Sequence, residues 1–341
     1  MNPLIKKRVA IIGAGIAGLS CASELVKAGF EVHVFDKSKG VGGRMSHRYY
    51  EAWEADHGAQ YFTVKDPLFG TQVTEWMNAK VIAPWGGKIV TLDRSTIRAL
   101  ESTTQRFVGV PAMTAPAKYL ASSLNVHTQH TVVGLKRINN LWRINTKEQG
   151  PFDLAFEYLI CAIPSVQARA LIGPYSESLD TSCKDVVMLP CWTLIAYFKK
   201  PLDLDFDGAF VDGSPFSWIA RDNTKPGRSS YETWVAQASN TWSQEYIDFN
   251  QYEIEPILLK AFKDLTDQDC DLYQSHLWRY AKLETPSELT YVYDENIKVG
   301  LCGDWLKNST VEGAWLSGYR MAQFLSCLLY TSDAADEEDS V

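Results

Sequence analysis

The hydrophobic pattern near the start of the chain changes from a strand-like run to a helical repeat and back. Residues 9–12 form an apolar, β-branched run, which is typical of a buried parallel strand. Apolar residues then recur at helical spacing over residues 16–26, and Gly29 follows as a helix-ending residue. Residues 31–35 read as the next strand. The pattern predicts a strand–helix–strand unit.

The turn between the first strand and the helix carries three glycines in a G-x-G-x-x-G spacing, Gly13, Gly15 and Gly18. Glycine costs roughly 0.5–1 kcal/mol inside a regular element, so three at this spacing need a reason. That reason is a tight turn, a close backbone approach to a pyrophosphate, and close helix–strand packing. Asp36 ends the second strand, where its carboxylate can accept the ribose hydroxyls. We expect a dinucleotide site here.

A secretion signal is the alternative interpretation of the same stretch. Lys6, Lys7 and Arg8 form a basic head before the apolar run. However, glycines interrupt that run, and it is shorter than the roughly 18–20 residues that span a bilayer. We therefore expect these residues to belong to the folded protein.

Later parts of the chain alternate in a way that predicts a second, mixed β-sheet domain. Strand-like runs that would return the chain to the first domain lie at 127–138, 141–146, 157–164 and 297–305. Aromatic and β-branched runs that suit a mixed sheet lie at 192–198, 208–211, 217–221, 233–239 and 276–281. Residues 240–249 and 255–265 read as helices on its outer face, the second with Pro256 at its first position.

Composition narrows the class of protein. The 341 residues suffice for two domains, and 46% hydrophobic with 22% charged residues is ordinary for a globular protein. The net charge of −8 argues against a nucleic-acid partner, and no run is long enough to predict a membrane span. Seven scattered cysteines without a C-x-x-C pair indicate reduced thiols in the cytoplasm, with no disulfide framework and no metal site.

The last stretch, residues 327–341, is treated separately. Its string "CLLYTSDAADE" resembles the translation of a transposase sequencing adapter, so we expect this tail to be non-native and exclude it from the fold. Without its five acidic residues the net charge would be −3 rather than −8, so acidity carries no functional meaning.

Two further signals favour FAD over a nicotinamide cofactor. "GVGGRMSHR" follows the second strand directly, and Arg44 in it can hold phosphate oxygens through two parallel hydrogen bonds. Near the other end, Asp304 follows a strand and can accept ribityl hydroxyls. A helix then begins near Glu312, and its N-terminal dipole would stabilise negative charge on a reduced flavin.

With "GAGIAG", "GGRM", "DHGAQYFT", "VGVPAM", "SWIARDNTKPGR", "HLWRYA", "GDW" and "VEGAWLSG", residues 8–326 resemble the bacterial renalase-type FAD-dependent oxidoreductases, which are relatives of the amine oxidases. The resemblance implies an α/β fold in which a Rossmann-type FAD-binding domain joins a second domain with a mixed β-sheet and flanking helices. It also implies noncovalent FAD, because no "SGGCY"-like motif lies near Cys270.

On this basis we expect a discontinuous FAD-binding domain of residues 1–70, 106–170 and 296–326, and a substrate domain of residues 71–105 and 171–295. The expected cofactor-binding residues are Gly13, Gly15, Ile16, Ala17, Gly18, Asp36, Lys37, Gly42, Gly43, Arg44, Met45, His57, Gly58, Ala59, Val133, Gly303, Asp304, Val311, Glu312, Gly313 and Ala314.

The resemblance implies oxidation of 2- or 6-dihydro isomers of NAD(P)H, with hydride passing to flavin N5, release of NAD(P)⁺, and reduction of O₂ to hydrogen peroxide. The expected catalytic or substrate-binding residues are Gln60, Tyr61, Trp192, Trp218, His276, Trp278, Arg279 and Tyr280. Two alternatives stay open: an amine oxidase or other flavin oxidase that uses the same aromatic residues, and a non-catalytic FAD-binding protein. The oligomeric state is not predicted.

Overall fold

The chain divides into two compact units, each of which is discontinuous. The computed structural model describes residues 6–51, 53–93, 96–101, 104–287 and 289–338, with 329–338 by backbone alone. The first unit comprises Met1–Gly43, Ala117–Val187 and Thr285–Val341, and the second comprises Arg44–Pro116 and Met188–Glu284. Residues 44–70 and 106–116, expected in the first domain, thus belong to the second unit.

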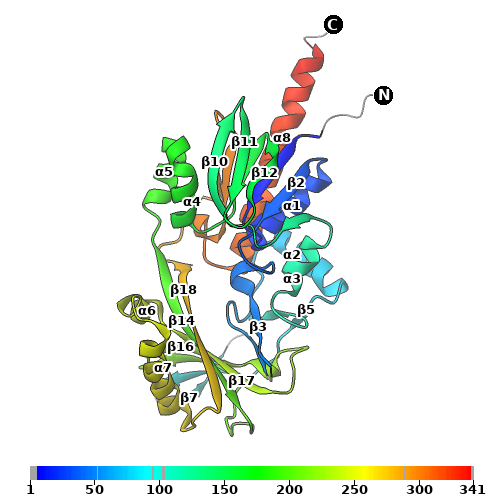
Figure 1. Cartoon of the computed structure of the whole chain (residues 1–341). Coiled ribbons are helices and arrows are strands. Elements are labelled where there is room, and N and C mark those ends of the chain that lie inside the picture. The colour runs from blue at the N-terminus through cyan, green and yellow to red at the C-terminus, as the bar shows by residue number, and fades with distance from the viewer. Residues whose placement is uncertain (1–5, 52, 94–95, 102–103, 288, 339–341) are drawn as a thin grey trace. The chain divides into compact units, whose positions relative to one another are not determined.

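A six-stranded sheet forms the centre of the first unit (Figure 1). Its order is β19 (Tyr291–Asp294), β20 (Val299–Cys302), β13 (Tyr158–Cys161), β1 (Arg8–Ile12), β2 (Glu31–Phe35) and β9 (Asn125–His127). Neighbouring strands are parallel except β19, which pairs antiparallel with β20. The expected strand–helix–strand unit is confirmed, and the runs at 157–164 and 297–305 return to the same sheet as β13 and β20, whereas those at 127–138 and 141–146 mainly form two strands of a separate sheet.

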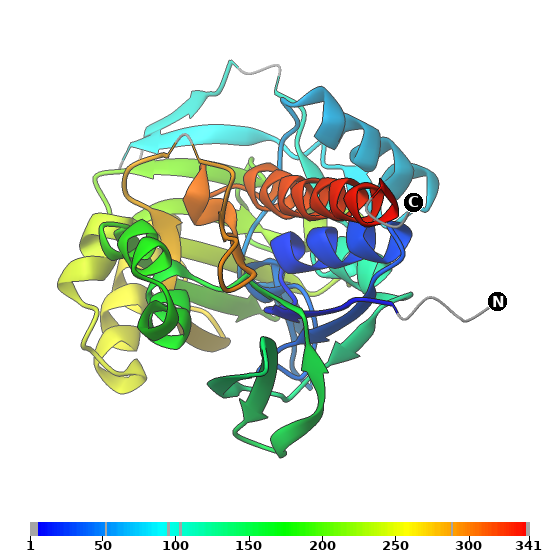
Figure 2. The same cartoon turned by 90° about the horizontal axis from the view of Figure 1, so that it is seen from above.

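Helices α1 (Ile16–Lys27) and α8 (Val311–Glu338) lie side by side on this sheet, as Figure 2 shows from above. They approach so closely that a Cβ at Gly318 would lie 1.9 Å from the carbonyl oxygen of Ala17. The Ser20 hydroxyl donates to the Trp315 carbonyl across the same contact, at 2.9 Å. The expected tail begins inside α8, and its last residues, 339–341, lie outside the described residues.

Smaller elements complete the first unit. β10 (Val132–Ile138), β11 (Leu141–Thr146) and β12 (Gly150–Phe156) form a separate antiparallel sheet. The Trp142 indole ties that sheet to the loop before β20 by donating to the Ile297 carbonyl at 2.9 Å. The remaining elements are α4 (Ser165–Ile172), η2 (Gly173–Tyr175), α5 (Glu177–Lys184), η4 (Asp304–Leu306) and α3 (Ala115–Ala121), which crosses the boundary between the units.

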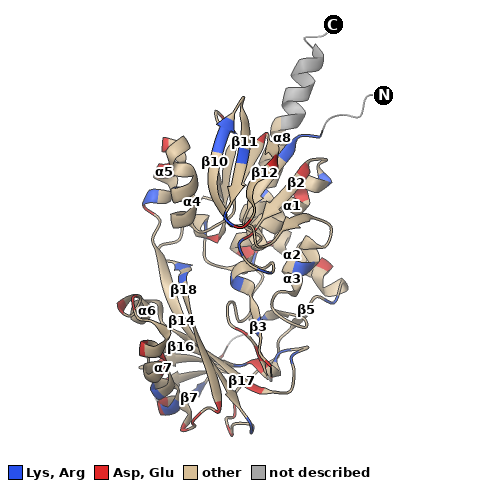
Figure 3. Cartoon of the chain, in the orientation of Figure 1, with Lys and Arg blue, Asp and Glu red and all other residues tan. Residues whose placement is uncertain are grey.

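A seven-stranded mixed sheet forms the second unit. Its order is β18 (Leu272–Leu283), β14 (Met188–Phe198), β17 (Glu232–Ala238), β16 (Phe216–Arg221), β15 (Gly208–Asp212), β6 (Ile89–Asp93) and β7 (Thr96–Ala99). All neighbours are antiparallel except β15 and β6. Figure 3 shows that the ribbon of β14 is free of charged residues, as expected for a strand covered on both faces.

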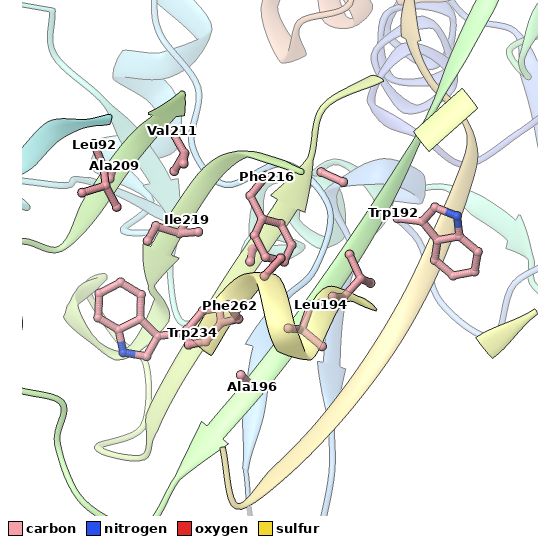
Figure 4. Packing of buried hydrophobic residues seen from close by; sticks show 14 of the residues in the cluster. Leu92, Trp192, Leu194, Ala196, Ala209, Val211, Phe216, Ile219, Trp234 and Phe262 are labelled. Carbon is pink, nitrogen blue, oxygen red and sulfur yellow. The ribbon is translucent and has the colours of Figure 1, made fainter. Parts of the chain in front are cut away.

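One face of this sheet packs on helices α6 (Asn240–Glu245) and α7 (Gln251–Thr266). Figure 4 shows the apolar side chains that fill this face, among them Leu194, Phe216, Trp234 and Phe262. The opposite face meets the hairpin of β3 (His47–Tyr49) and β4 (Glu54–Asp56), where Trp53 packs in a small apolar cluster with Ile195. This contact explains why residues 44–70 belong to the second unit.

The predicted start of α7 is wrong. The helix begins at Gln251, and Pro256 lies inside it rather than at its first position. Asn250 accepts from the backbone N–H groups of Tyr252 and Glu253, while the Glu253 carboxylate accepts from the Asn250 N–H. This reciprocal capping box satisfies the free donors of the first turn and starts the helix before the proline.

The second unit is completed by η1 (Gly43–Met45), α2 (Pro67–Asn78), η3 (Asp222–Thr224) and the antiparallel pair β5 (Ile82–Pro84) and β8 (Phe107–Gly109). Among the described residues, no helix combines the length and apolarity needed to cross a bilayer.

The close contact between α1 and α8 can be tested with Gly318→Ala. The added methyl group would overlap the Ala17 carbonyl, so the helices must separate, and we expect a loss of about 1–3 kcal/mol in the free energy of unfolding. Denaturant unfolding measures this loss. Gly40→Ala is the control, because a Cβ there meets nothing within 4 Å. Equal stability of the two variants would contradict the packing argument.

Candidate functional site

The three glycines of the first turn have different structural reasons. A Cβ at Gly13, where φ is +110°, would lie 2.6 Å from the Ala162 carbonyl oxygen. A Cβ at Gly18 would lie 2.0 Å from the Gly13 carbonyl oxygen, so α1 could not rest on β1. A Cβ at Gly15 meets nothing within 4 Å. Packing therefore explains Gly13 and Gly18, whereas the space beside Gly15 is open among the described residues and leaves room for the ligand expected at this turn.

The carboxylate of Asp36 is fixed beside this turn. Its two oxygens accept hydrogen bonds from the backbone N–H groups of Ala14 at 2.7 Å and Ser38 at 2.8 Å. Each oxygen retains acceptor capacity for a hydroxyl group. Gly42 donates from its backbone to the Ala14 carbonyl at 2.9 Å and forms a bridge with Gly15. The turn, Asp36 and the Gly42–Gly43 segment thus form one cradle, and its donors and acceptors fit a ribose and a pyrophosphate.

The expected residues around this cradle differ in exposure. Ile16 and Ala17 are buried in the first turn of α1, whereas Lys37 is exposed. Val133 on β10 is 53% exposed, which leaves its side chain accessible to a ligand.

The second part of the expected FAD site lies after β20. The Gly303 N–H donates to the Ser317 hydroxyl at 2.8 Å, and the Trp305 indole donates to the Ile163 carbonyl at 3.0 Å. Asp304, Val311 and Glu312 are nearly fully buried at this end of α8. Gly313 packs against Asn308 so closely that a Cβ would overlap its side-chain oxygen, and Ala314 follows in the same turn. The first turn of α8 therefore has a fixed position relative to β20.

In the second unit, Arg44 and the segment around Gly58 are held together. Ala59 donates from its backbone to the Arg44 carbonyl at 2.8 Å, and a Cβ at Gly58 would lie 2.0 Å from that carbonyl. Arg44 Nη1 donates to the carbonyls of Tyr280 and Ala281, each at 3.3 Å. Its neighbour Met45 is buried. Arg44 thus joins η1 to β18, which the sequence did not predict.

Five of the expected residues lie on one face of the sheet of the second unit, in two groups. The Trp278 indole donates to the His57 carbonyl at 3.0 Å, and the rings of His57 and His276 meet edge to face at 5.0 Å. Further along, Tyr61 and Trp218 form a second edge-to-face pair at 5.4 Å. Gln237 between them donates to the Gly58 carbonyl at 2.7 Å.

Three other expected residues belong to neither of these two groups of rings. Trp192 belongs to the apolar core on the opposite face, under α6, and its indole donates to the Tyr246 carbonyl at 3.0 Å (Figure 4). Gln60 is buried, and its side-chain amide donates to the carbonyls of Asp56 and Gly58. Arg279 is exposed on β18. Trp192 thus packs in the core of this unit and Gln60 binds the Asp56–Gly58 backbone, and their expected part in a substrate wall stays a prediction.

A buried ionic cluster supports this face, and the sequence analysis missed it. Lys225 Nζ donates to Asp222 at 2.7 Å and to the side-chain amide oxygen Oε1 of Gln60 at 3.1 Å, and lies 3.4 Å from Asp56. Arg228 pairs with Asp56, and Asp56 also accepts from the Met113 backbone at 2.9 Å. The two acids and two bases compensate one another, as buried charges require.

The electrostatic environment of the carboxylates follows from this pairing. Burial alone would raise the pKa of Asp56, but the charge of Lys225 and the hydrogen bond from His47 lower it below its usual value. Burial raises the pKa of Asp222, and the charge of Lys225 opposes this effect only in part. Asp56 is therefore the more firmly ionised of the two acids.

The two histidines of this face are held neutral. Burial, followed by the charge of Arg48, lowers the pKa of His57 to about 3 and that of His276 to about 4. Arg48 Nη2 lies 3.1 Å from Nδ1 of His276. Nδ1 of His57 is buried and has no hydrogen-bond partner among the described residues. This part of the face presents uncharged rings at neutral pH.

An aromatic cluster lies at the Tyr61 end of the same face and consists of Tyr61, Trp85, Phe210 and Trp218. Their ring centroids are 4.8–6.4 Å apart in neighbouring pairs. Arg106 lies with its Cζ atom 5.2 Å from the centroid of the Tyr61 ring. The sequence analysis missed both Trp85 and Arg106. The only available signal was a basic residue directly before the short apolar run "FVG".

Among the comparisons with known proteins, a family profile covers the first glycine turn. A family profile described as an NAD(P)-binding Rossmann-like domain matches residues 11–76. Phytoene desaturase of Fusarium fujikuroi is 44% identical over 54 residues, which are 16% of this chain and 10% of that protein. The zeta-carotene-forming phytoene desaturase of Myxococcus xanthus is 38% identical over 52 residues, 15% of this chain and 10% of that protein. The chain matches only about a tenth of the length of these curated relatives.

Solved structures resemble the whole chain. A protein of Exiguobacterium sp. 255-15, provisionally assigned as a protoporphyrinogen oxidase, has a TM-score of 0.77 at 9% identity, covering 95% of this chain and 100% of that one. Cyclohexylamine oxidase of Brevibacterium oxydans IH-35A has a TM-score of 0.73 at 13% identity and the same coverage. Putrescine oxidase has a TM-score of 0.71 at 12% identity, covering 95% and 99%.

The chain has the FAD-binding fold of these oxidases. At such identities the similarity establishes the fold, with its Rossmann-like sheet and its second, mixed sheet, and leaves the substrate open. Among the described residues, no group of three or more histidine, cysteine or acidic side chains is placed to hold a metal ion.

The role of Gly15 can be tested with Gly15→Ala. Its φ of −75° suits alanine and a Cβ has free space, so the cofactor-free protein should keep its unfolding temperature. The methyl group would occupy the cradle, and we expect FAD to bind at least about tenfold more weakly, a loss of about 1.4 kcal/mol. Titration of the cofactor-free protein with FAD measures the affinity. Unchanged affinity would remove Gly15 from the FAD site.

The neutral histidines predict a dependence of stability on pH. The folded pKa values lie below the unfolded value of 6.5, so their contribution is complete above pH 6.5 and is lost as the pH falls towards 4. Each histidine should contribute a slope of about 1.4 kcal/mol per pH unit in that interval. Denaturant unfolding at several pH values tests this: His57→Gln should reduce the slope, and the double variant with His276→Gln should reduce it further. A wild-type stability that is flat from pH 6.5 to 4 would contradict the burial of neutral rings.

Proposed function

We propose that the protein is an FAD-dependent oxidase that takes hydride from 2- or 6-dihydro isomers of NAD(P)H, releases NAD(P)⁺ and reduces O₂ to hydrogen peroxide. The FAD-binding fold supports the cofactor, and the resemblance to the renalase-type oxidoreductases suggests the substrate. The observation that carries the proposal is the face of the second sheet on which His276, Trp278, Tyr61 and Trp218 present mainly uncharged aromatic rings.

Each unit would contribute differently. In the first unit, Gly15 and the N–H groups of the first turn of α1 would bind the pyrophosphate, and Asp36 would bind a ribose. Gly303, Asp304 and the first turn of α8 would bind the ribityl and flavin end. Bound FAD would supply a hydride acceptor that O₂ can reoxidise.

In the second unit, the aromatic residues would orient a flat substrate ring. Hydride transfer from a dihydronicotinamide restores an aromatic ring, so the protein has mainly to position two rings. The buried acids fit this picture because each is already paired with a base and lacks the freedom of a general base.

An amine oxidase is the second candidate, because putrescine oxidase and cyclohexylamine oxidase share the fold. Aromatic rings could equally surround an uncharged amine. The cysteines without disulfide partners lead us to propose a cytoplasmic location as well.

Anaerobic mixing of the FAD-loaded protein with substrates distinguishes these functions. We expect 2- or 6-dihydroNAD to bleach the flavin absorbance rapidly, with hydrogen peroxide formed once air is admitted. Putrescine, cyclohexylamine and ordinary 4-dihydroNAD are the comparison compounds. Fast bleaching by an amine alone would establish the amine oxidase, and absence of bleaching by every reductant would indicate a non-catalytic FAD protein.

A further inference from the structure

Two hydrogen-bond donors beside the aromatic cluster have no acceptor. The Trp218 side chain is 6% exposed, and its Nε1 has no hydrogen-bond partner among the described residues. Arg106 Nε is likewise buried without a partner in the described part of the chain. Both side chains contact the Tyr61 ring, at 5.4 Å for the Trp218 centroid and 5.2 Å for Arg106 Cζ. Buried donors are normally satisfied, so this pair indicates an acceptor that the described residues do not supply.

Both donors are held by rigid backbone. The Arg106 carbonyl accepts from the Trp85 N–H at 2.8 Å, and the next residue, Phe107, exchanges two backbone hydrogen bonds with Phe62. On the other side, the Trp218 ring lies directly against β15, where a Cβ at Gly208 would lie 3.0 Å from it. Strand pairing therefore fixes the backbone from which the Arg106 side chain extends, and packing against β15 holds the Trp218 ring.

The charges around the aromatic cluster favour a ligand with a hydrogen-bond acceptor over a cationic ligand. Arg106 lies over Tyr61, and Lys225 Nζ lies 5.9 Å from the Trp85 ring centroid. The acids near this end, Asp56 and Asp222, are already paired with Lys225 and Arg228. An alkylammonium group would therefore meet positive charges with no free carboxylate among the described residues of the cluster.

We propose that Arg106 and Trp218 form a recognition site for a planar ring that carries a carbonyl or carboxylate group, with the ring against Tyr61 and its oxygen accepting from Nε and Nε1. This inference rests on the proposed function and deepens it: the carboxamide of a dihydronicotinamide has this chemistry, and an alkylamine lacks it. The site would set substrate class, and neither residue has a role in the transfer of hydride itself.

Binding of small probes to the oxidised, FAD-loaded protein tests the site without turnover. The probes are nicotinamide, nicotinate and benzylamine, which share a ring size and differ in the substituent, and calorimetry gives their affinities. We expect nicotinate and nicotinamide to bind more tightly than benzylamine. Trp218→Phe keeps the ring and removes the N–H, and should weaken nicotinamide about 3–10-fold. Arg106→Gln should weaken nicotinate about tenfold or more, because a charge-assisted bond is lost.

Matched controls exclude general effects. Trp242→Phe changes an indole that stacks on Tyr246 by α6, and Arg98→Gln changes an exposed arginine of β7. Both should bind the probes as the wild type does. Tighter binding of benzylamine, or wild-type affinities in both Trp218→Phe and Arg106→Gln, would overturn the inference.

The two proposals fail in different ways. If dihydroNAD is oxidised and its KM stays unchanged in both site variants, the function stands and the recognition site is wrong. If no dihydronicotinamide is oxidised but the two variants bind nicotinamide and nicotinate more weakly than the wild type, the recognition site stands and the proposed function is wrong. If both are right, the variants raise KM for dihydroNAD by the same factors while kcat stays within about twofold.

Discussion

Direct contact between backbones is the constraint on which the first unit depends. Gly18 lets α1 rest on the carbonyl of Gly13, and Gly318 lets α8 rest on that of Ala17. No side chain separates these elements, so the start of α1 has a fixed place at the carboxyl end of β1. Asp36 is held there by the Ala14 N–H, and Gly15 is the one glycine of the turn beside which a Cβ would meet nothing within 4 Å.

The second unit solves a different problem, because one sheet has to build a core and a binding face at once. Alternation along each strand separates the two tasks: Trp192 and Leu277 face α6 and α7, whereas His276 and Trp278 face the segment of His57. The ions of Lys225 and its partners are buried beneath that second face as a neutral set. The charges of this ionic cluster are thus paired with one another, and the neutral rings of His57 and His276 lie on the face above them.

Local patterns predicted the first unit well, since a strand, a glycine turn and a helix are specified by residues close in sequence. The FAD-binding fold was predicted from them and is confirmed. The sequence could not predict which aromatic residues lie on which face of the second sheet, because Trp192 and Trp278 both belong to aromatic strands. Only the strand register shows the difference: Trp192 lies opposite Leu277 and shares its face, whereas Trp278 points to the other face. The partners of Asp56 could not be predicted either, since Lys225 and Arg228 lie 169 and 172 residues away from it in the sequence. The start of α7 was mispredicted at Pro256 because the capping box of Asn250 begins the helix before the proline.

The contact between α1 and α8 also bears on how the protein is made. A ribosome delivers β1 and α1 before the second unit, whereas β20 and α8, which pair in the same sheet and cover the same helix, follow it. The apolar surface of the nascent first unit therefore stays uncovered while the second unit is synthesised. The contacts that later cover this surface join residues far apart in the sequence. Such topologies fold slowly and are prone to aggregation while incomplete, so protection by chaperones during synthesis would matter more for this half of the protein than for the other.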